Sequence, residues 1–411
     1  MIREWRHYPA TVRRLVTARF LRSVGQGLLV VDFSLYLKAL GWHPARIGLV
    51  LAAGGLFGAL LALGVGWLSD RWGRKRFVLV YEAMTVVSAA IAGLTASGAW
   101  LSVIAIGASF GRGQGGGAGP FGPAEQAWIG GLVRPDQRGR LFSWNASVGF
   151  IGMGLGSLLA ALPAALSPWL PGALAFRPLF AIPLAGSLLN IVLIARQPDG
   201  VLGEVTDAVE ERTAVRAENR SLAKLMMANL TNGLAVGMVG PLMAVWFTLR
   251  FGVSPAAIGG IMAASFMATA WASLVTAWFG ERVGIVRTIV GFRVVSVMFL
   301  AALPLAPNFP IAAALFFVRS ALNRGSVGAR QAVSVSLTRD ARRGWAASVN
   351  FVSMRVPASV GPALTGLLME SGQLALPLYA AAGLQLVYAV LYQRFFGTLD
   401  RNAVTAISPG R

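Results

Sequence analysis

Twelve apolar segments run through this chain, and they limit its fold more than any other feature. A bilayer hydrocarbon core about 30 Å thick is crossed by a helix of roughly 20 apolar residues. The segments fall near residues 16–40, 45–67, 77–98, 100–132, 139–165, 173–195, 222–249, 256–279, 286–306, 309–336, 344–370 and 374–396. The chain is 56% hydrophobic and only 13% charged, which is typical of a polytopic membrane protein. We therefore predict an all-α membrane protein with twelve transmembrane helices.

One long, charged stretch, residues 197–221, separates the first six segments from the last six. We predict that it is a cytoplasmic linker between two six-helix halves, with room for a short amphipathic helix on the membrane surface. The expected parts of the chain are a basic N-terminal arm (1–15), an N-terminal half (16–196), the linker (197–221), a C-terminal half (222–397) and a C-terminal tail (398–411).

The two halves repeat each other in sequence. At an offset of 211 residues, 39–76 match 250–287 at 13 of 38 positions. At an offset of 205 residues, 122–156 match 327–361 at 10 of 35 positions. Parallel repeats of this kind are related by a pseudo-two-fold axis along the membrane normal, which lets one half rock against the other around a central site.

Lys and Arg residues gather on one side of the predicted membrane. Of the 36, 24 lie in segments on one side, four on the opposite side and eight within spans. The positive-inside rule then puts both termini and the loop at 66–76 in the cytoplasm. We expect a multi-pass protein of a prokaryotic cytoplasmic (inner) membrane, and the net charge of +20 reflects this orientation and not a nucleic-acid partner.

Several kinds of chemistry have no residues to support them. The chain has no Cys, and its two His residues, His7 and His43, lie far apart in the sequence and form no ligand cluster. It has no phosphate-binding loop of the G-x-x-x-x-G-K-S/T type and no nucleophile, base and orienter combination. We therefore expect no metal, no cofactor, no enzymatic activity and no nucleotide drive. The partners we expect are a small-molecule solute, membrane lipids and a proton as coupling ion.

The stretch GWLSDRWGRKR joins the second and third spans. It fits the pattern G-x-x-x-D-R-x-G-R-K/R-R/K at every defined position, namely Gly66, Asp70, Arg71, Gly73, Arg74, Lys75 and Arg76. With the twelve spans and the parallel repeats, this stretch resembles the major facilitator superfamily, closest in motif pattern to its proton-coupled drug and solute exporters. The resemblance implies a monomer that works by alternating access.

The resemblance also implies that the loop is a conformational latch. Its acid, Asp70, is expected to dock on the other half at the start of the eleventh helix, beside Arg342 and Arg343, when the cytoplasmic side is shut. The alternative is a basic loop that only orients the chain, which leaves Asp70 and Gly73 unexplained. The resemblance to proton-driven exporters also implies a run of glycines followed by a proline in the fifth span. This chain has Ser157 where that proline is expected, which weakens an assignment to proton antiport.

Charged side chains at mid-membrane are costly, so each one is a functional candidate. Asp32 lies well inside the first span, and the resemblance puts spans 1, 4, 7 and 10 around a central cavity. Asp32 would carry a proton or meet a cation there, or else form a structural pair with a nearby Arg. The residues predicted for proton coupling or the substrate cavity are Asp32, Tyr36, Arg112, Gln114, Asn232, Arg319, Asn323 and Arg355.

The buried arginines allow two interpretations. Arg112 and Arg319, in equivalent spans, suit bidentate binding of an anionic group, or they neutralise Asp32. Glu125 and Arg330 are repeat mates of opposite sign, and we expect them to form a salt bridge that gates the cytoplasmic side, with separate headgroup contacts as the alternative.

Other charges receive plainer interpretations. Glu82 and Arg293 are mates on peripheral spans and are expected to be structural. Arg19 and Arg22 are expected to extend to the cytoplasmic surface.

The function that follows is secondary active transport of a small organic solute by alternating access. Of the possible transport modes, proton-coupled export of an amphiphilic compound is the leading prediction. An organic-anion symporter or exchanger that uses the cavity arginines is the alternative. From a different class, a non-transporting sensor or a lipid scramblase on the same fold remains open.

Overall fold

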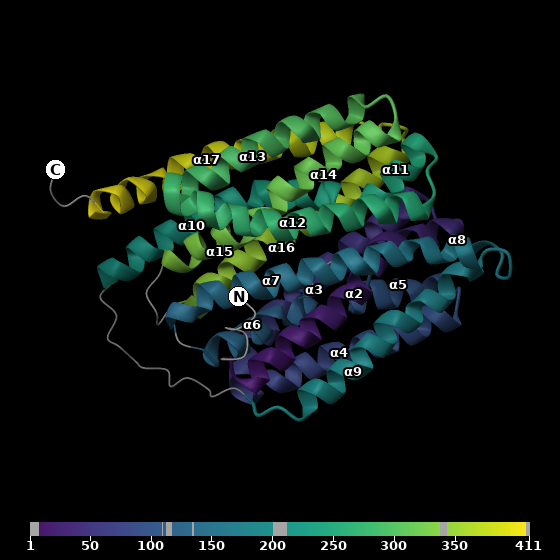
Figure 1. Ribbon diagram of the computed structural model, residues 1–411, viewed down its shortest axis with the longest axis horizontal. Helices are drawn as coiled ribbons and strands as arrows, with labels where there is room; N and C mark the ends of the chain where they lie inside the picture. The colour runs from purple at the N-terminus through teal and green to yellow at the C-terminus, as the bar shows by residue number, and fades with distance from the viewer. Residues whose placement is uncertain are drawn as a thin grey trace.

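The computed structural model describes residues 8–108, 110–111, 117–133, 135–199, 212–337 and 343–407, and within these ranges every regular element is a helix. Two bundles lie side by side, the first half of the chain below and the second above (Figure 1). The helices of the first half are α2 (Ala10–Ala39), α3 (Pro44–Trp72), α4 (Arg74–Leu94), α5 (Gly98–Gly107), α6 (Gly122–Gly131), α7 (Pro135–Leu158), α8 (Leu162–Leu166) and α9 (Ala181–Ala195).

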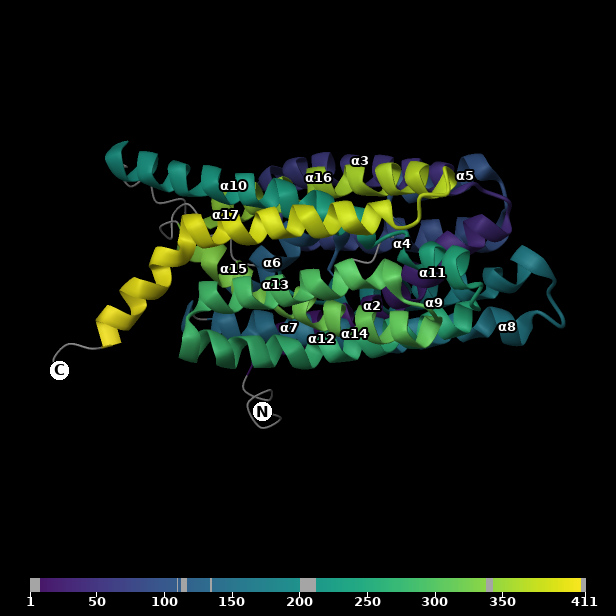
Figure 2. The ribbon, with the colours of Figure 1, turned by 90° about the horizontal axis from the view of Figure 1, so that it is seen from above.

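The second half repeats this order. Its helices are α10 (Arg212–Val239), α11 (Met243–Phe251), α12 (Pro255–Val283), α13 (Ile285–Ala302), α14 (Phe309–Gly325), α15 (Val327–Ser336), α16 (Arg343–Glu370) and α17 (Leu376–Ile407). Short 3-10 turns complete the chain at Gly119–Phe121, Leu159–Ala161, Gly172–Phe180 and Leu303–Leu305. Figure 2 shows the first turns of α10 and the last turns of α17 projecting from the same end of the bundle.

The prediction of an all-helical, twelve-span protein is confirmed. Nine helices of the described ranges are long and apolar enough to cross a membrane. The remaining three predicted spans are α5 with α6, α14 with α15, and α16. In the fourth span α5 ends at Gly107 and helical structure resumes at Gly119, and the tenth span is interrupted at Ser326. Helix α10 begins ten residues before the predicted span, and α17 continues past residue 397 into the predicted tail.

Small residues bring helices of the same half into close contact. Gly27 of α2 lies against the backbone of Met153 in α7, and a Cβ atom there would overlap it. The Ser157 hydroxyl of α7 donates to the Gly27 carbonyl at 3.0 Å. In the other half, Thr365 of α16 donates to the Met238 carbonyl of α10 at 2.8 Å. The residue that replaces the expected proline is therefore a hydrogen-bond donor between helices, and the second half repeats the contact.

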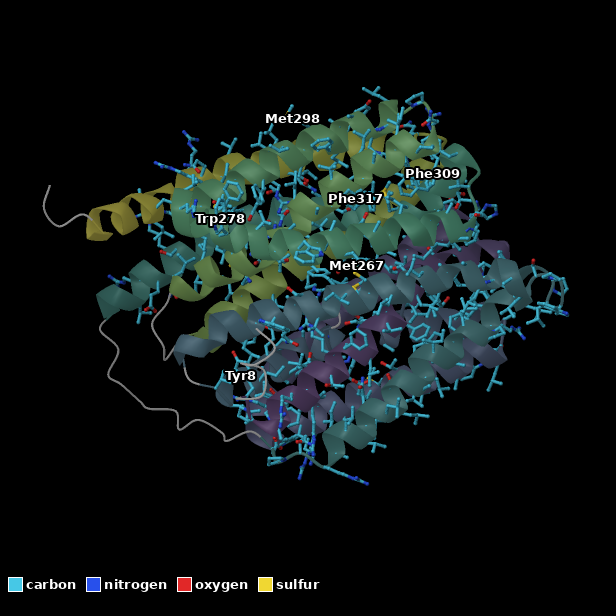
Figure 3. The ribbon with its side chains drawn as sticks, in the orientation of Figure 1. Tyr8, Met267, Trp278, Met298, Phe309 and Phe317 are labelled. Carbon is cyan, nitrogen blue, oxygen red and sulfur yellow. The ribbon has the colours of Figure 1, made fainter. Side chains whose placement is uncertain are left out.

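The two halves meet along α3 with α16 and along α7 with α12. Gly48 of α3 lies against the Pro362 carbonyl, and Gly366 of α16 lies against the backbone of Pro44. Figure 3 shows Met267 at the seam where α12 runs beside α7. Because α3 begins at Pro44, these glycine contacts close the end of the bundle from which α3 starts.

At the opposite end, each half has the same sharp turn between two helices. Gly73 joins α3 to α4 with φ 90°, and Gly284 joins α12 to α13 with φ 106°. A positive φ in this range favours glycine, because other residues carry a Cβ atom that clashes there. The turn geometry accounts for Gly73 of the loop pattern independently of any latch.

A carboxylate caps the helix that follows each of these turns. Asp400 of α17 accepts from the backbone N–H groups of Val286 (3.1 Å) and Arg287 (2.8 Å). Asp199, just after α9, accepts from the N–H of Lys75 at 3.0 Å. Negative groups are stabilising at a helix N-terminus, where backbone N–H groups have no partner within the helix. The end of the last span in each half is thereby tied to the start of the third span.

Candidate functional site

Asp32 lies two thirds of the way along α2 and is 2% exposed. Neither of its carboxylate oxygens has a hydrogen-bond partner among the residues that the structure describes. An ionised carboxylate buried without a partner is strongly unfavourable, so the group is kept neutral by a proton or compensated by a ligand. The alternative prediction, a structural pair with Arg, is not found among the described residues, and the role of Asp32 as a proton carrier stays a prediction.

Tyr36, one turn further along α2, belongs to a different environment. Its hydroxyl donates to the carbonyl of Thr95, at the end of α4, at 3.2 Å. Its ring packs against Phe180 and Phe176, with centroids 5.3 Å and 6.1 Å away. Tyr36 thus joins helices of the N-terminal half, and the structure does not bring it together with the Asp32 carboxylate.

A buried ionic cluster lies inside the N-terminal half. Arg22 of α2 is 4% exposed and binds two carboxylates, Glu82 of α4 at 2.6 Å and Glu125 of α6 at 2.7 Å. Asn190 of α9 also donates to Glu82, at 3.3 Å. The prediction that Arg22 extends to the membrane surface is wrong, because two buried acids hold its guanidinium inside the bundle. Glu82 is structural, as predicted.

Glu125 helps to order the interrupted fourth span. Its second oxygen accepts from the backbone N–H of Ala118 at 3.1 Å, and Gln26 of α2 donates to the Gly117 carbonyl at 2.9 Å. The structure does not bring Glu125 together with Arg330, because Arg22 occupies the carboxylate. The predicted cytoplasmic gate is therefore not formed in this structure.

Two predicted cavity residues belong to a polar cluster inside the C-terminal half. Asn323 of α14 donates to the Gln385 side chain of α17 at 3.0 Å. Arg293 of α13 reaches the same oxygen at 3.3 Å. Arg319 is 5% exposed, and its backbone carbonyl accepts from Ser296 of α13 at 3.2 Å. The side chain of Asn323 is thus directed toward α17, and the backbone of Arg319 lies against α13; neither helix was predicted to belong to the site.

The remaining described cavity candidates lie on α10 and α16. The amide of Asn232 donates to the sulfur of Met354 at 3.4 Å, which places it between these two helices. Arg355 lies over the ring of Phe351 at 5.1 Å, on the helix α16 that packs against α3 of the N-terminal half.

Part of the predicted site lies outside the described residues, namely Arg112, Gln114 and Arg342. The side chains of Asp70, Arg71 and Arg343 are likewise outside the description, although Gly66, Asp70 and Arg71 are helical in backbone. The latch therefore stays a prediction. Of its basic residues, Lys75 donates from Nζ to the Gln197 carbonyl at 2.7 Å, and Arg76 is exposed.

Sequence reasoning missed the roles of Gln385 and Asn190. Each is 0% exposed on the last span of its half, and each contacts the charged residue of the third span, Arg293 or Glu82. The available signal was a polar amide in the middle of an apolar span, which in lipid needs an interhelical partner.

This architecture defines a class of membrane protein, built from two parallel six-helix repeats with buried charged groups in each. The sequence profile described as "Major Facilitator Superfamily" matches residues 15–224 and 225–409. The chain belongs to that superfamily, and its fold and family are those of a secondary transporter and not of an enzyme.

Relatives and solved structures agree with this assignment. An uncharacterized membrane protein of Saccharomyces cerevisiae, YJR124C, is 24% identical over 402 residues, with 88% of this chain and 89% of that protein covered. An inward-facing bacterial homolog of the human lysosomal transporter Spinster aligns with a TM-score of 0.69 at 16% identity, covering 97% of this chain and 98% of that one. The nucleoside transporter NupG aligns with a TM-score of 0.70 at 14% identity, covering 94% of this chain and 100% of that one. The human organic anion transporter MFSD10 aligns with a TM-score of 0.69 at 15% identity, covering 94% of this chain and 100% of that one.

Proposed function

We propose that this protein exports a small amphiphilic organic solute in exchange for protons, and that Asp32 is the group that carries the proton. The observation that carries the proposal is the burial of the Asp32 carboxylate at 2% exposure with both oxygens unpartnered among the described residues. Such a group alternates between a protonated state and a state compensated by a solute, which is the requirement for coupling the two. The outward direction follows the loop pattern at Gly66–Arg76.

Alternating access is supported by the arrangement of the two halves. Glycines bring α3 and α16 into contact at the end where α3 begins, including Gly48 against Pro362. The opposite end holds the two capped turns at Gly73 and Gly284, each tied within its own half. Each half is thus internally bound. Between the halves, small residues bring α3 against α16, and the rings of Phe150 and Phe266 stack between α7 and α12. This division into two bound units suits rocking as two rigid bodies.

Proton flux in proteoliposomes under an imposed pH gradient tests this function. The probes are lipophilic cations such as tetraphenylphosphonium, and organic anions such as taurocholate. We expect cation-triggered proton flux in the native protein and its loss in Asp32→Asn, with Glu370→Gln at the exposed end of α16 as the matched acid control. Flux that survives in Asp32→Asn contradicts the assigned role of Asp32.

A second candidate, exchange or symport of an organic anion, is favoured by Arg355. Its guanidinium lies over the ring of Phe351, on the helix α16 that packs against α3 of the other half. A guanidinium on a helix at the contact between the halves is suited to bind a carboxylate or phosphate bidentately. One protein of the same fold is described as an organic anion transporter, the human MFSD10. Anion-triggered flux that is lost in Arg355→Gln and kept in Asp32→Asn would favour this candidate over proton-coupled export.

A further inference from the structure

The equivalent interiors of the two halves have opposite charge. Glu82 of α4 and Arg293 of α13 are 211 residues apart, the offset of the first repeat, and Glu125 and Arg330 are 205 apart, the offset of the second. Each carboxylate of the N-terminal cluster is therefore replaced by an arginine in the C-terminal half. In the N-terminal half Arg22 binds both acids, with contacts of 2.6 Å and 2.7 Å.

The sequence places no carboxylate within the spans of the C-terminal half to balance these arginines. From residue 219 to 280 it has no Asp or Glu, and the same holds from 282 to 339 and from 371 to 399. The acids from residue 219 to the end of the last span, each at or beyond the limit of an apolar span, are Glu281, Asp340, Glu370 and Asp400. The positive charge inside the C-terminal bundle thus has no counter-charge within the spans.

Two arginines of this half lie deep in the protein on neighbouring helices. Arg293 is 1% exposed and Arg319 is 5% exposed, and Asn323, one turn after Arg319, shares the Gln385 oxygen with Arg293. Arg330 is the repeat mate of Glu125, which in the N-terminal half meets the same arginine as Glu82. The guanidinium of Arg293 also lies 5.0 Å from the ring centre of Tyr388 in α17. Buried charges of one sign repel each other and lose their hydration, so a cluster of this kind is expected to hold a compensating ion.

The unused hydrogen-bonding groups of the cluster are donors. Among the described residues, these buried atoms have no hydrogen-bond partner: Nε and Nη2 of Arg293, Nε of Arg319, Nη1 of Arg330, Nε2 of Gln385 and the hydroxyl of Tyr388. The acceptor that the protein supplies, Oε1 of Gln385, is already shared by Arg293 and Asn323 at 3.3 Å and 3.0 Å. A group that accepts several hydrogen bonds and carries negative charge is what the cluster lacks.

We propose that the C-terminal half binds a small inorganic monoanion of the halide class between Arg293, Arg319 and Arg330, at the place where the N-terminal half has glutamate carboxylates. We commit to a small ion because the side chains of Arg293, Arg319 and Gln385 are buried inside one bundle. The site lies among α13, α14 and α17 and is separate from Asp32. The inference does not rest on the proposed function.

Thermal unfolding of the purified, detergent-solubilised protein tests the site. Sodium chloride or bromide is titrated against sodium gluconate at constant ionic strength, so that screening is the same throughout. We expect a saturable rise in Tm of about 3 °C or more with halide, because a ligand that binds the folded state stabilises it in proportion to its occupancy. Equal Tm values in halide and gluconate would overturn the proposal.

Three variants identify the residues. Arg293→Gln is expected to weaken the halide dependence at least about tenfold. Arg293→Glu supplies its own carboxylate, as Glu82 does in the other half, so its Tm is expected to be independent of halide and no lower than that of the native protein in gluconate. The matched control Arg250→Gln, on an arginine at the exposed end of α11, keeps the native response. A full halide response in Arg293→Glu would contradict the site even if Arg293→Gln fails to fold.

A direct measurement and an independence control complete the test. Crystals grown in bromide are expected to show an anomalous peak among the three guanidinium groups, and a peak elsewhere in the protein contradicts the location. Asp32→Asn is expected to keep the halide response, since Asp32 lies in the other half. If the native protein shows the halide response but no coupled proton flux, the anion site stands and the proposed function fails.

Discussion

Glu82 and Arg293 occupy equivalent positions in the two halves, yet Glu82 is bound by an arginine at 2.6 Å whereas Arg293 meets only neutral side chains within hydrogen-bonding distance among the described residues. The asymmetry starts in the first helix of each half. Helix α2 contributes Arg22, while α10 has no charged residue of either sign from Leu225 to Val239. In one half of the repeat the buried acids are thus bound by an arginine, and the other half presents buried donors.

Replacing Arg22 is expected to destabilise the protein strongly. Arg22→Gln leaves the buried carboxylates of Glu82 and Glu125 without their cation, and breaking a buried pair from one side costs about 3–5 kcal/mol. The measurement is unfolding in detergent, with Arg14→Gln on the exposed face of α2 as the control. The double variant Arg22→Gln/Glu82→Gln should recover part of the loss, and a double variant less stable than Arg22→Gln would contradict the pairing.

The hydroxyl of Ser157 is expected to contribute modestly to the contact between α7 and α2. Ser157→Ala removes the 3.0 Å hydrogen bond to the Gly27 carbonyl, which costs about 1 kcal/mol in unfolding free energy. Ser371→Ala, where the hydroxyl is exposed and bonds only within its own turn, serves as the comparison. An equal effect in the two variants would show that the bond between the helices adds nothing.

The carboxylate cap on α13 is expected to hold α17 against it. Asp400→Ala removes both backbone contacts, and losing a cap costs about 1 kcal/mol. Hydrogen exchange should then rise at the amides of Val286 and Arg287 and stay unchanged at Lys75, which Asp199 caps in the other half. Glu370→Ala is the control on an exposed acid. Unchanged exchange at Val286 would argue against the cap.

The glycine contacts between the halves are expected to control closure of one end of the bundle. Gly48→Leu puts a side chain against the Pro362 carbonyl, whereas Gly64→Leu on the same helix enters open space. The chain has no native Cys, so a single Ala263→Cys, at 3% exposure, reports on the seam. Labelling by a membrane-impermeant thiol reagent should be several-fold faster with Gly48→Leu and unchanged with Gly64→Leu. Equal rates in both backgrounds would contradict the closure.

Much of the fold follows from the sequence because its determinants are local. Lengths of apolar segments predict the spans, and the matched Gly73 and Gly284 mark the same turn in each half through their positive φ angles. The break in the fourth span was likewise readable from its glycine content.

The site was less predictable, because facing directions depend on helix rotation and packing. Tyr36 and Asn323 lie on spans expected to line the cavity, but their side chains bond to Thr95 and Gln385 within their own halves. Arg22 lies one turn from Arg19 near the end of a span. Arg22 is buried because it binds Glu82 and Glu125, which are far from it in the sequence.

The measurement that tests the central claim most directly is proton release on solute binding. Purified protein in weakly buffered detergent solution is mixed with tetraphenylphosphonium, and the pH of the medium is recorded. The account predicts release of about one proton per protein molecule, because the cation replaces the proton on Asp32, and no release from Asp32→Asn. Binding of the cation by the native protein without proton release, or equal release from Asp32→Asn, would contradict the account.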